Sequence, residues 1–194
     1  MHKKLIMEIR EKPKKISDMP ERAREVLNYF QIENSSGGVP IIEILTRLGI
    51  KVYQMELEPE KLSAYIAVNP KYQERYGTNK ITCVNSRDNI GHKRFALAHE
   101  LAHYLFDFKE NDDIVYYNTY FADDNLNDEA ERRANAFAAN LLMPEREFKN
   151  LAKDWEKQGS KADTITELAK YFQVSATAVI KRCQELQMEG YSIS

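Results

Sequence analysis

Apolar and polar residues recur along the chain with two different periods, which predicts both strands and helices. Short segments that alternate with a period of two, or that run apolar between polar turns, are typical of β-strands. Three such strands are predicted at residues 50–55, 64–68 and 80–85, and a fourth is expected at 114–117. The loop between the second and third strands is short and polar, which favours antiparallel pairing of these two.

Longer segments repeat their apolar residues at helical spacing. The predicted helices cover residues 20–30, 41–48, 92–106, 129–142, 145–157, 164–172 and 176–187. Thr164 and Glu167 have the spacing of a capping box, and Ser175 is expected to cap the last helix. The segment at 92–106 is apolar on nearly all sides, so we expect this helix to be buried.

The buried helix contains an H-E-x-x-H motif at residues 99–103. Positions i and i+4 of a helix share one face, so His99 and His103 can offer two imidazole nitrogens to one metal ion. Glu100 lies beside that face and can reach a water held by the metal, which is the arrangement of a zinc peptidase. The alternative is a pair of core histidines that are hydrogen-bonded to the backbone.

A catalytic zinc site needs a third protein ligand. The metzincin spacing fails, because Phe106 stands where that pattern requires glycine and no histidine follows. A carboxylate at the start of the helix at 129–142 remains, with Asp128, Glu129 and Glu131 as candidates. Glu131 is favoured because Asn135, at i+4, can orient a ligand histidine from the same face. The alternative makes Glu131 a solvated acid in the first helical turn.

Two blocks of sequence closely resemble the ImmA/IrrE family of bacterial metallopeptidases. The first runs from Arg94 to Leu105 and the second from Glu131 to Pro144, within a similarity that extends over about residues 40–186. The resemblance implies Zn²⁺ as the cofactor, bound by His99, His103 and Glu131, with Glu100 as the catalytic glutamate. It also implies a cytoplasmic regulatory protease whose substrates are helix-turn-helix repressors of prophages, mobile elements or damage-response genes.

The predicted fold is α+β. A small zincin-like antiparallel sheet packs against the H-E-x-x-H helix and against a second helix that carries the remaining ligand. We expect a metallopeptidase domain over residues 1–150, which includes the N-terminal helices, and a helix-turn-helix-like region over residues 151–194. Zincins commonly hold substrate as an added strand on a sheet edge, and residues 64–68 are our candidate for that edge. Arg94 is expected to anchor the motif helix to a carboxylate.

Composition and charge favour a cytoplasmic protein. The 194 residues carry a formal charge of −2, which gives no general attraction to nucleic acid or to membranes. No run is long enough for a membrane span or a signal peptide. Cys83 and Cys183 stand in apolar surroundings and are expected to be reduced. The basic N-terminus, residues 1–15, is expected to be a solvated arm.

A non-catalytic regulator is the competing hypothesis. The last two helices have the shape of a DNA-binding helix-turn-helix, with Thr177, Lys181 and Arg182 on the second of them. Residues 161–194, however, contain four Lys or Arg and four Asp or Glu, so this region has no net basic charge. We therefore expect the pair to pack against the protein or to contact a protein partner rather than DNA.

Overall fold

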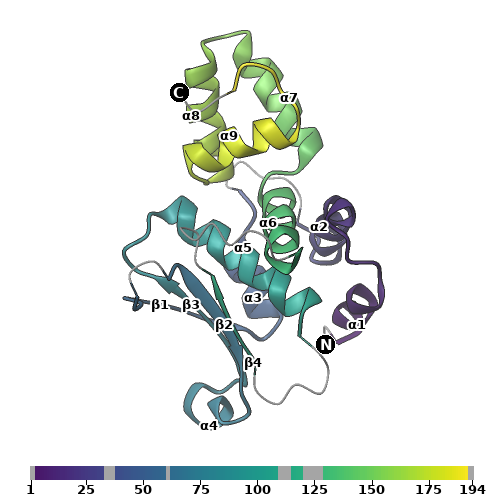
Figure 1. Ribbon diagram of the computed structural model, residues 1–194, viewed down its shortest axis with the longest axis vertical. Coiled ribbons are helices and arrows are strands. Elements are labelled where there is room, and N and C mark those ends of the chain that lie inside the picture. Colours follow the sequence, from purple (N-terminus) through teal and green to yellow (C-terminus); the bar gives the residue numbers. More distant parts are fainter. Residues whose placement is uncertain (1–2, 33–37, 60–61, 109–114, 120–128, 192–194) are drawn as a thin grey trace.

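The computed structural model describes the chain except for residues 1–2, 33–37, 60–61, 109–114, 120–128 and 192–194 (Figure 1). The described elements follow in chain order: α1 (Lys3–Glu11), the 3-10 turn η1 (Ile16–Asp18), α2 (Met19–Tyr29), α3 (Ile41–Arg47), β1 (Lys51–Met55), β2 (Ala64–Val68), α4 (Tyr72–Tyr76), β3 (Lys80–Asn85), α5 (Ile90–Phe106), β4 (Val115–Thr119), α6 (Glu129–Leu142), α7 (Glu145–Glu156), α8 (Lys161–Phe172) and α9 (Ala176–Glu185). The α+β class is confirmed.

The four strands form one sheet in the order β1-β3-β2-β4. The predicted antiparallel pairing of β2 with β3 is confirmed, and β2 also pairs antiparallel with β4. The expectation of a wholly antiparallel sheet needs correction, because β1 pairs parallel with β3. Once β3 and β4 occupy both sides of β2, β1 can add to the described sheet only at an outer edge. The prediction that residues 64–68 form an open sheet edge for substrate is therefore wrong, because β2 pairs with β3 on one side and with β4 on the other.

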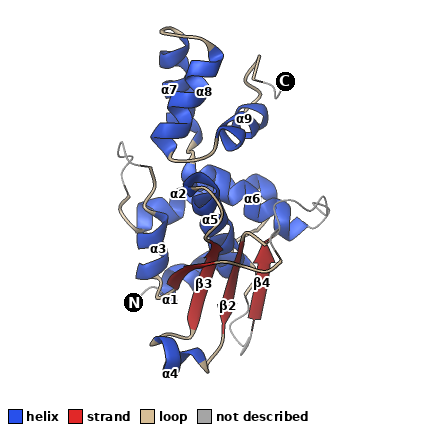
Figure 2. Ribbon diagram, turned by 90° about the vertical axis from the view of Figure 1, so that its left-hand side faces the viewer, coloured by secondary structure: helices blue, strands red, loops and turns tan. Residues whose placement is uncertain are grey.

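Helix α5 is the centre of the core. It lies over one face of the sheet, as Figure 2 shows, and it also packs against α6. Nearly all of its residues are buried. Asn89 is the N-cap of the helix: its side chain accepts a hydrogen bond from the backbone N–H of His92 at 2.9 Å. Leu101 and Leu105 are fully buried, in the same cluster as Ile66 of the sheet and Phe137 of α6. This packing leaves the polar residues of the motif inside the protein.

The N-terminus is not the solvated arm that its charge suggests. Residues 3–11 form α1, which buries Leu5 and Ile9, one helical turn apart, in the main core. Arg10 and Lys14 then donate hydrogen bonds to the carbonyls of Tyr104 at 2.8 Å and Phe106 at 2.9 Å. The last carbonyls of a helix have no partner within it, so these two basic side chains stabilise the C-terminal end of α5.

Helices α7 to α9 gather at the end of the molecule opposite α4 (Figure 1). Helix α8 begins three residues earlier than predicted, because Ser160 rather than Thr164 is the cap and Asp163 completes the capping box. Ser175 caps α9 as expected. Helix α7 crosses residue 150, the predicted domain boundary, and one apolar cluster contains residues from both sides of it. The division into two domains stays a prediction.

Buried arginines join the C-terminal helices to the rest of the fold. Arg94 of α5 donates hydrogen bonds to the carbonyl of Gln173 at 3.0 Å and to the carbonyl of Val39 at 2.7 Å. The prediction that Arg94 anchors the helix to a carboxylate is therefore wrong. Arg182 of α9 donates to the carbonyl of Met143 at 3.2 Å and to the side chain of Asn140 at 2.7 Å, at the end of α6. Both helices that carry the candidate ligands are thus tied to α8 and α9.

Within the described part of the chain, no helix has the combination of length and apolar character that crossing a bilayer requires.

Candidate metal centre

The two histidines of the motif converge on one point in the core. His99 and His103 lie one turn apart on α5, and their Nε2 atoms are 2.9 Å from each other. Both side chains are buried, with 1% of their surface exposed. Their placement follows from the helical period alone, because residues four apart project from the same side of a helix. The packing of α5 then encloses this side within the protein.

Helix α6 brings a carboxylate to the same point. The two oxygens of Glu131 lie 3.1 Å from Nε2 of His99 and 3.2 Å from Nε2 of His103, so each oxygen faces one imidazole. Glu129, two residues earlier, is exposed, and it is not among the residues that converge here. Asp128, the other candidate, lies outside the described residues. The structure therefore brings Glu131 to the histidines rather than leaving it a solvated acid.

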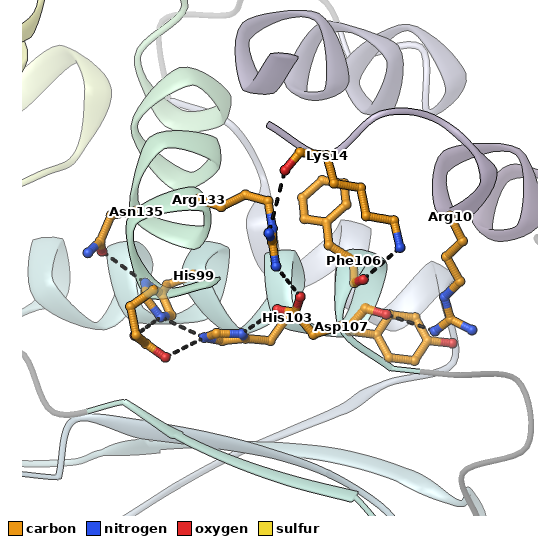
Figure 3. A network of polar contacts seen from close by, with 10 residues as sticks. Arg10, Lys14, His99, His103, Phe106, Asp107, Arg133 and Asn135 are labelled. Atoms are coloured by element: carbon orange, nitrogen blue, oxygen red, sulfur yellow. Dashed lines mark hydrogen bonds and ion pairs between the residues drawn. The ribbon is translucent and has the colours of Figure 1, made fainter. Parts of the chain in front are cut away.

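Each histidine has a second polar neighbour on its other ring nitrogen (Figure 3). Oδ1 of Asn135 lies 2.9 Å from Nδ1 of His99, as the i+4 spacing from Glu131 suggested. Oδ2 of Asp107 lies 2.8 Å from Nδ1 of His103. Asp107 was not among the predicted site residues, although its position four residues after His103 was a signal for this contact. Arg133, which forms an ion pair with Asp107, was not predicted either.

Burial and mutual contacts shift the pKa values of these groups. Burial lowers the pKa of His99, and this effect outweighs its hydrogen bond to Glu131. Burial also acts to lower the pKa of His103, but hydrogen bonds to Asp107 and Glu131 and the charge of Glu100 raise it to about 9. Burial would raise the pKa of Glu131, yet the two imidazoles hold it well below its usual value. Without metal, the cluster therefore holds an ionised carboxylate beside one neutral and one protonated histidine.

The three side chains fit a catalytic metal site. Two imidazole nitrogens and one carboxylate oxygen are a common ligand set of catalytic zinc. Ligand atoms 2.0 to 2.1 Å from a tetrahedral ion lie about 3.3 Å apart, which is close to the 2.9 to 3.2 Å found here. The core-histidine alternative expects backbone partners, whereas the ring nitrogens of His99 and His103 face side chains and each other.

Glu100, the glutamate of the H-E-x-x-H motif, lies close to the three ligand side chains. It follows His99 directly on α5, is fully buried, and is close enough for its charge to raise the pKa of His103. A buried carboxylate of this kind is costly unless nearby groups stabilise its charge. A metal ion at the three ligand positions would supply positive charge next to it.

Comparisons with known proteins agree with this geometry. The sequence matches the profile of peptidase family M78, described as the IrrE N-terminal-like domain, over residues 45–184. No curated protein matches the chain. The matched range covers more than half of the chain and contains His99, Glu100, His103 and Glu131. It confirms the predicted resemblance to the ImmA/IrrE family. The chain therefore belongs to the IrrE N-terminal-like family M78, a family of metallopeptidases.

Proposed function

We propose that the protein is a zinc-dependent endopeptidase whose metal is bound by His99, His103 and Glu131. The observation that carries this proposal is the convergence of these three side chains, whose ligand atoms all lie within 4.8 Å of one another. Nitrogen and carboxylate donors in a set of three favour zinc over magnesium or calcium, which prefer oxygen ligands alone. Three protein ligands also leave a fourth position open for water and substrate.

Glu100 is the proposed general base. A bound zinc ion would lower the pKa of its water toward about 7 and polarise the scissile carbonyl. Glu100 would take a proton from the attacking water and deliver it to the leaving amine nitrogen. Asn135 would hold His99 with Nδ1 protonated, so that Nε2 keeps its lone pair for the metal.

Substitution of Glu100 by glutamine tests this assignment. Glutamine keeps the shape of the side chain but cannot act as a base, so zinc should still bind at one ion per chain. We expect the rate of cleavage to fall by about 10²- to 10⁴-fold, the usual contribution of general acid–base catalysis. The exposed Glu129→Gln is the matched control and should cleave at the wild-type rate. Wild-type cleavage by Glu100→Gln would show that the base is a different residue.

The proposed substrate is a helix-turn-helix repressor in the cytoplasm. The resemblance to the ImmA/IrrE family supports the substrate class, and two buried cysteines that are not bonded to each other fit a reducing compartment. The test is incubation of the purified protein with the repressor encoded beside it, followed by mass spectrometry of the products. We expect defined fragments that disappear when a chelator removes the zinc. An intact repressor under zinc-loaded conditions would contradict the proposed substrate.

The DNA-binding alternative is less favoured. Of the three residues that the sequence offered for DNA contact, Thr177 and Lys181 are exposed, but Arg182 is buried and bonded to α6. A regulator of this kind would bind DNA without zinc, with an affinity that falls as salt rises. Binding that is unaffected by chelator and lost in Lys181→Ala would favour it over the peptidase.

A further inference from the structure

Asp107 stands where α5 ends, directly beside a proposed zinc ligand. Its backbone N–H donates to the carbonyl of His103 at 2.9 Å, which fixes it one helical turn beyond that residue. Its Oδ2 atom lies 2.8 Å from Nδ1 of His103. Only 10% of the Asp107 side chain is exposed, so water competes little for this contact. The carboxylate and the imidazole therefore form one buried unit.

Arg133 holds the other oxygen of Asp107 in an ion pair. It comes from α6, two residues after Glu131, and its guanidinium also lies 3.5 Å from the carbonyl of Lys14. Figure 3 shows the resulting chain of contacts from the N-terminal segment through Arg133 and Asp107 to His103. The Arg133 side chain is 13% exposed. Asp107 is thus fixed by its own helix and by the helix that supplies the third ligand.

A carboxylate and an amide act differently on a ligand histidine. Both accept a hydrogen bond from Nδ1, which leaves the lone pair of Nε2 available to a metal. A carboxylate also carries negative charge, so its hydrogen bond is stronger and it makes the imidazole a better electron donor. His99 has the amide of Asn135, whereas His103 has the carboxylate of Asp107. The two histidines therefore differ in the charge of the group that contacts Nδ1, which is neutral for His99 and negative for His103.

We propose that Asp107, anchored by Arg133, is the positioning residue for His103 and sets how tightly that histidine binds zinc. This inference rests on the proposed zinc site and adds the residue that orients one of its ligands. The competing explanation is that the Arg133–Asp107 ion pair only ties α6 to α5, in which case zinc binding would not depend on the carboxylate.

Zinc affinity of the full chain separates these explanations. We expect competition against a chelating dye to show a roughly 10- to 100-fold loss for Asp107→Ala, the range typical of partners that orient a metal ligand. The titration is made above about pH 9, where protons no longer compete with zinc for His103. Asp107→Asn keeps an oxygen that can accept from Nδ1 and should lose less. Arg133→Gln leaves the carboxylate but removes its anchor, so its affinity should lie between those of wild type and Asp107→Ala. Asp154→Asn, an exposed acid on α7, is the matched control and should bind like wild type.

A spectroscopic signature tests the hydrogen bond itself. The protein has four histidines, so a correlation spectrum of ¹⁵N-labelled imidazoles in the zinc-loaded chain is simple to assign. We expect the Nδ1–H of His103 to be protected from exchange with water in wild type and in Asp107→Asn, and to be lost from the spectrum in Asp107→Ala. Circular dichroism of each variant shows whether it is folded. If Asp107→Ala does not fold, Asp107→Asn and Arg133→Gln decide the question.

The outcomes of these experiments differ for the two proposals. Absence of zinc binding by the wild-type chain would refute the proposed function, and the positioning role would fall with it. Zinc binding by wild type together with affinities within twofold of it for folded Asp107→Asn and Arg133→Gln would refute the positioning role alone. Reduced affinity of folded Asp107→Ala with an unchanged signal from the Nδ1–H of His103 would also refute it, because the loss would then arise elsewhere.

Discussion

Zinc binding should weaken as the pH falls, because His103 must lose a proton before it can bind the metal. In the metal-free protein, burial acts to lower the pKa of His103, but its contacts with Asp107, Glu131 and Glu100 raise it to about 9. At pH 7 its deprotonation therefore costs roughly 2.7 kcal/mol, since one pKa unit corresponds to about 1.4 kcal/mol. The apparent affinity for zinc should be roughly 100-fold lower at pH 7 than above pH 9.

The other two ligands should add little to this dependence. Burial lowers the pKa of His99, so it is already neutral at pH 7. The imidazoles hold the pKa of Glu131 well below its usual value, so it stays ionised throughout. Between pH 7 and pH 9 the affinity should thus rise about tenfold per unit, with release of one proton from His103 per zinc bound. Chelator-buffered zinc titrations measure the affinity, and calorimetry in buffers of different ionisation enthalpy counts the protons.

The Asp107→Asn variant isolates the contribution of His103. Ionisation of a zinc-bound water near pH 7 adds a pH dependence of its own, which wild type and variant share. Asp107 is the largest of the contributions that raise the pKa of His103. In the variant this pKa should fall, so the affinity should level off at a lower pH than in wild type. Equal slopes for the two proteins between pH 7 and pH 9 would refute the reasoning.

Three further substitutions test the ligand set and the packing around it. Glu131→Gln should lower zinc affinity in equilibrium dialysis by more than the roughly 10- to 100-fold typical of an outer contact, and equal losses in Glu129→Gln would contradict the assignment. Arg94→Met should lower the free energy of unfolding by about 1–3 kcal/mol in urea, because the buried carbonyl of Val39 loses its donor; an unchanged midpoint would contradict it. Gly91→Ala should lower stability by about 1–3 kcal/mol in the same assay, since its Cβ would lie 2.6 Å from the backbone of Val174; wild-type stability would show that the turn before α9 adjusts freely.

Local patterns predicted most of the elements but only some of the contacts at the site. The strands at 64–68 and 80–85 and the helix at 129–142 have the predicted bounds. The predictions failed where a short segment depends on distant packing. Helix α1 is stabilised by burial of Leu5 and Ile9 and was hidden by the basic residues around them. The five-residue helix α4 lies within a loop whose composition is polar throughout.

The sequence by itself determined which side chains could act together within one helix. His99 with His103, and Glu131 with Asn135, are four residues apart, and the helical period places each pair on one face wherever the helix packs. Only the tertiary structure decided that these two faces meet, that β1 adds beside β3, and that Arg133 reaches Asp107. Hydrogen bonds within a helix depend on neighbours in sequence, whereas contacts between helices depend on how the whole core packs. That difference explains why the H-E-x-x-H motif could be recognised in the sequence, whereas the ion pair between Arg133 and Asp107 could not.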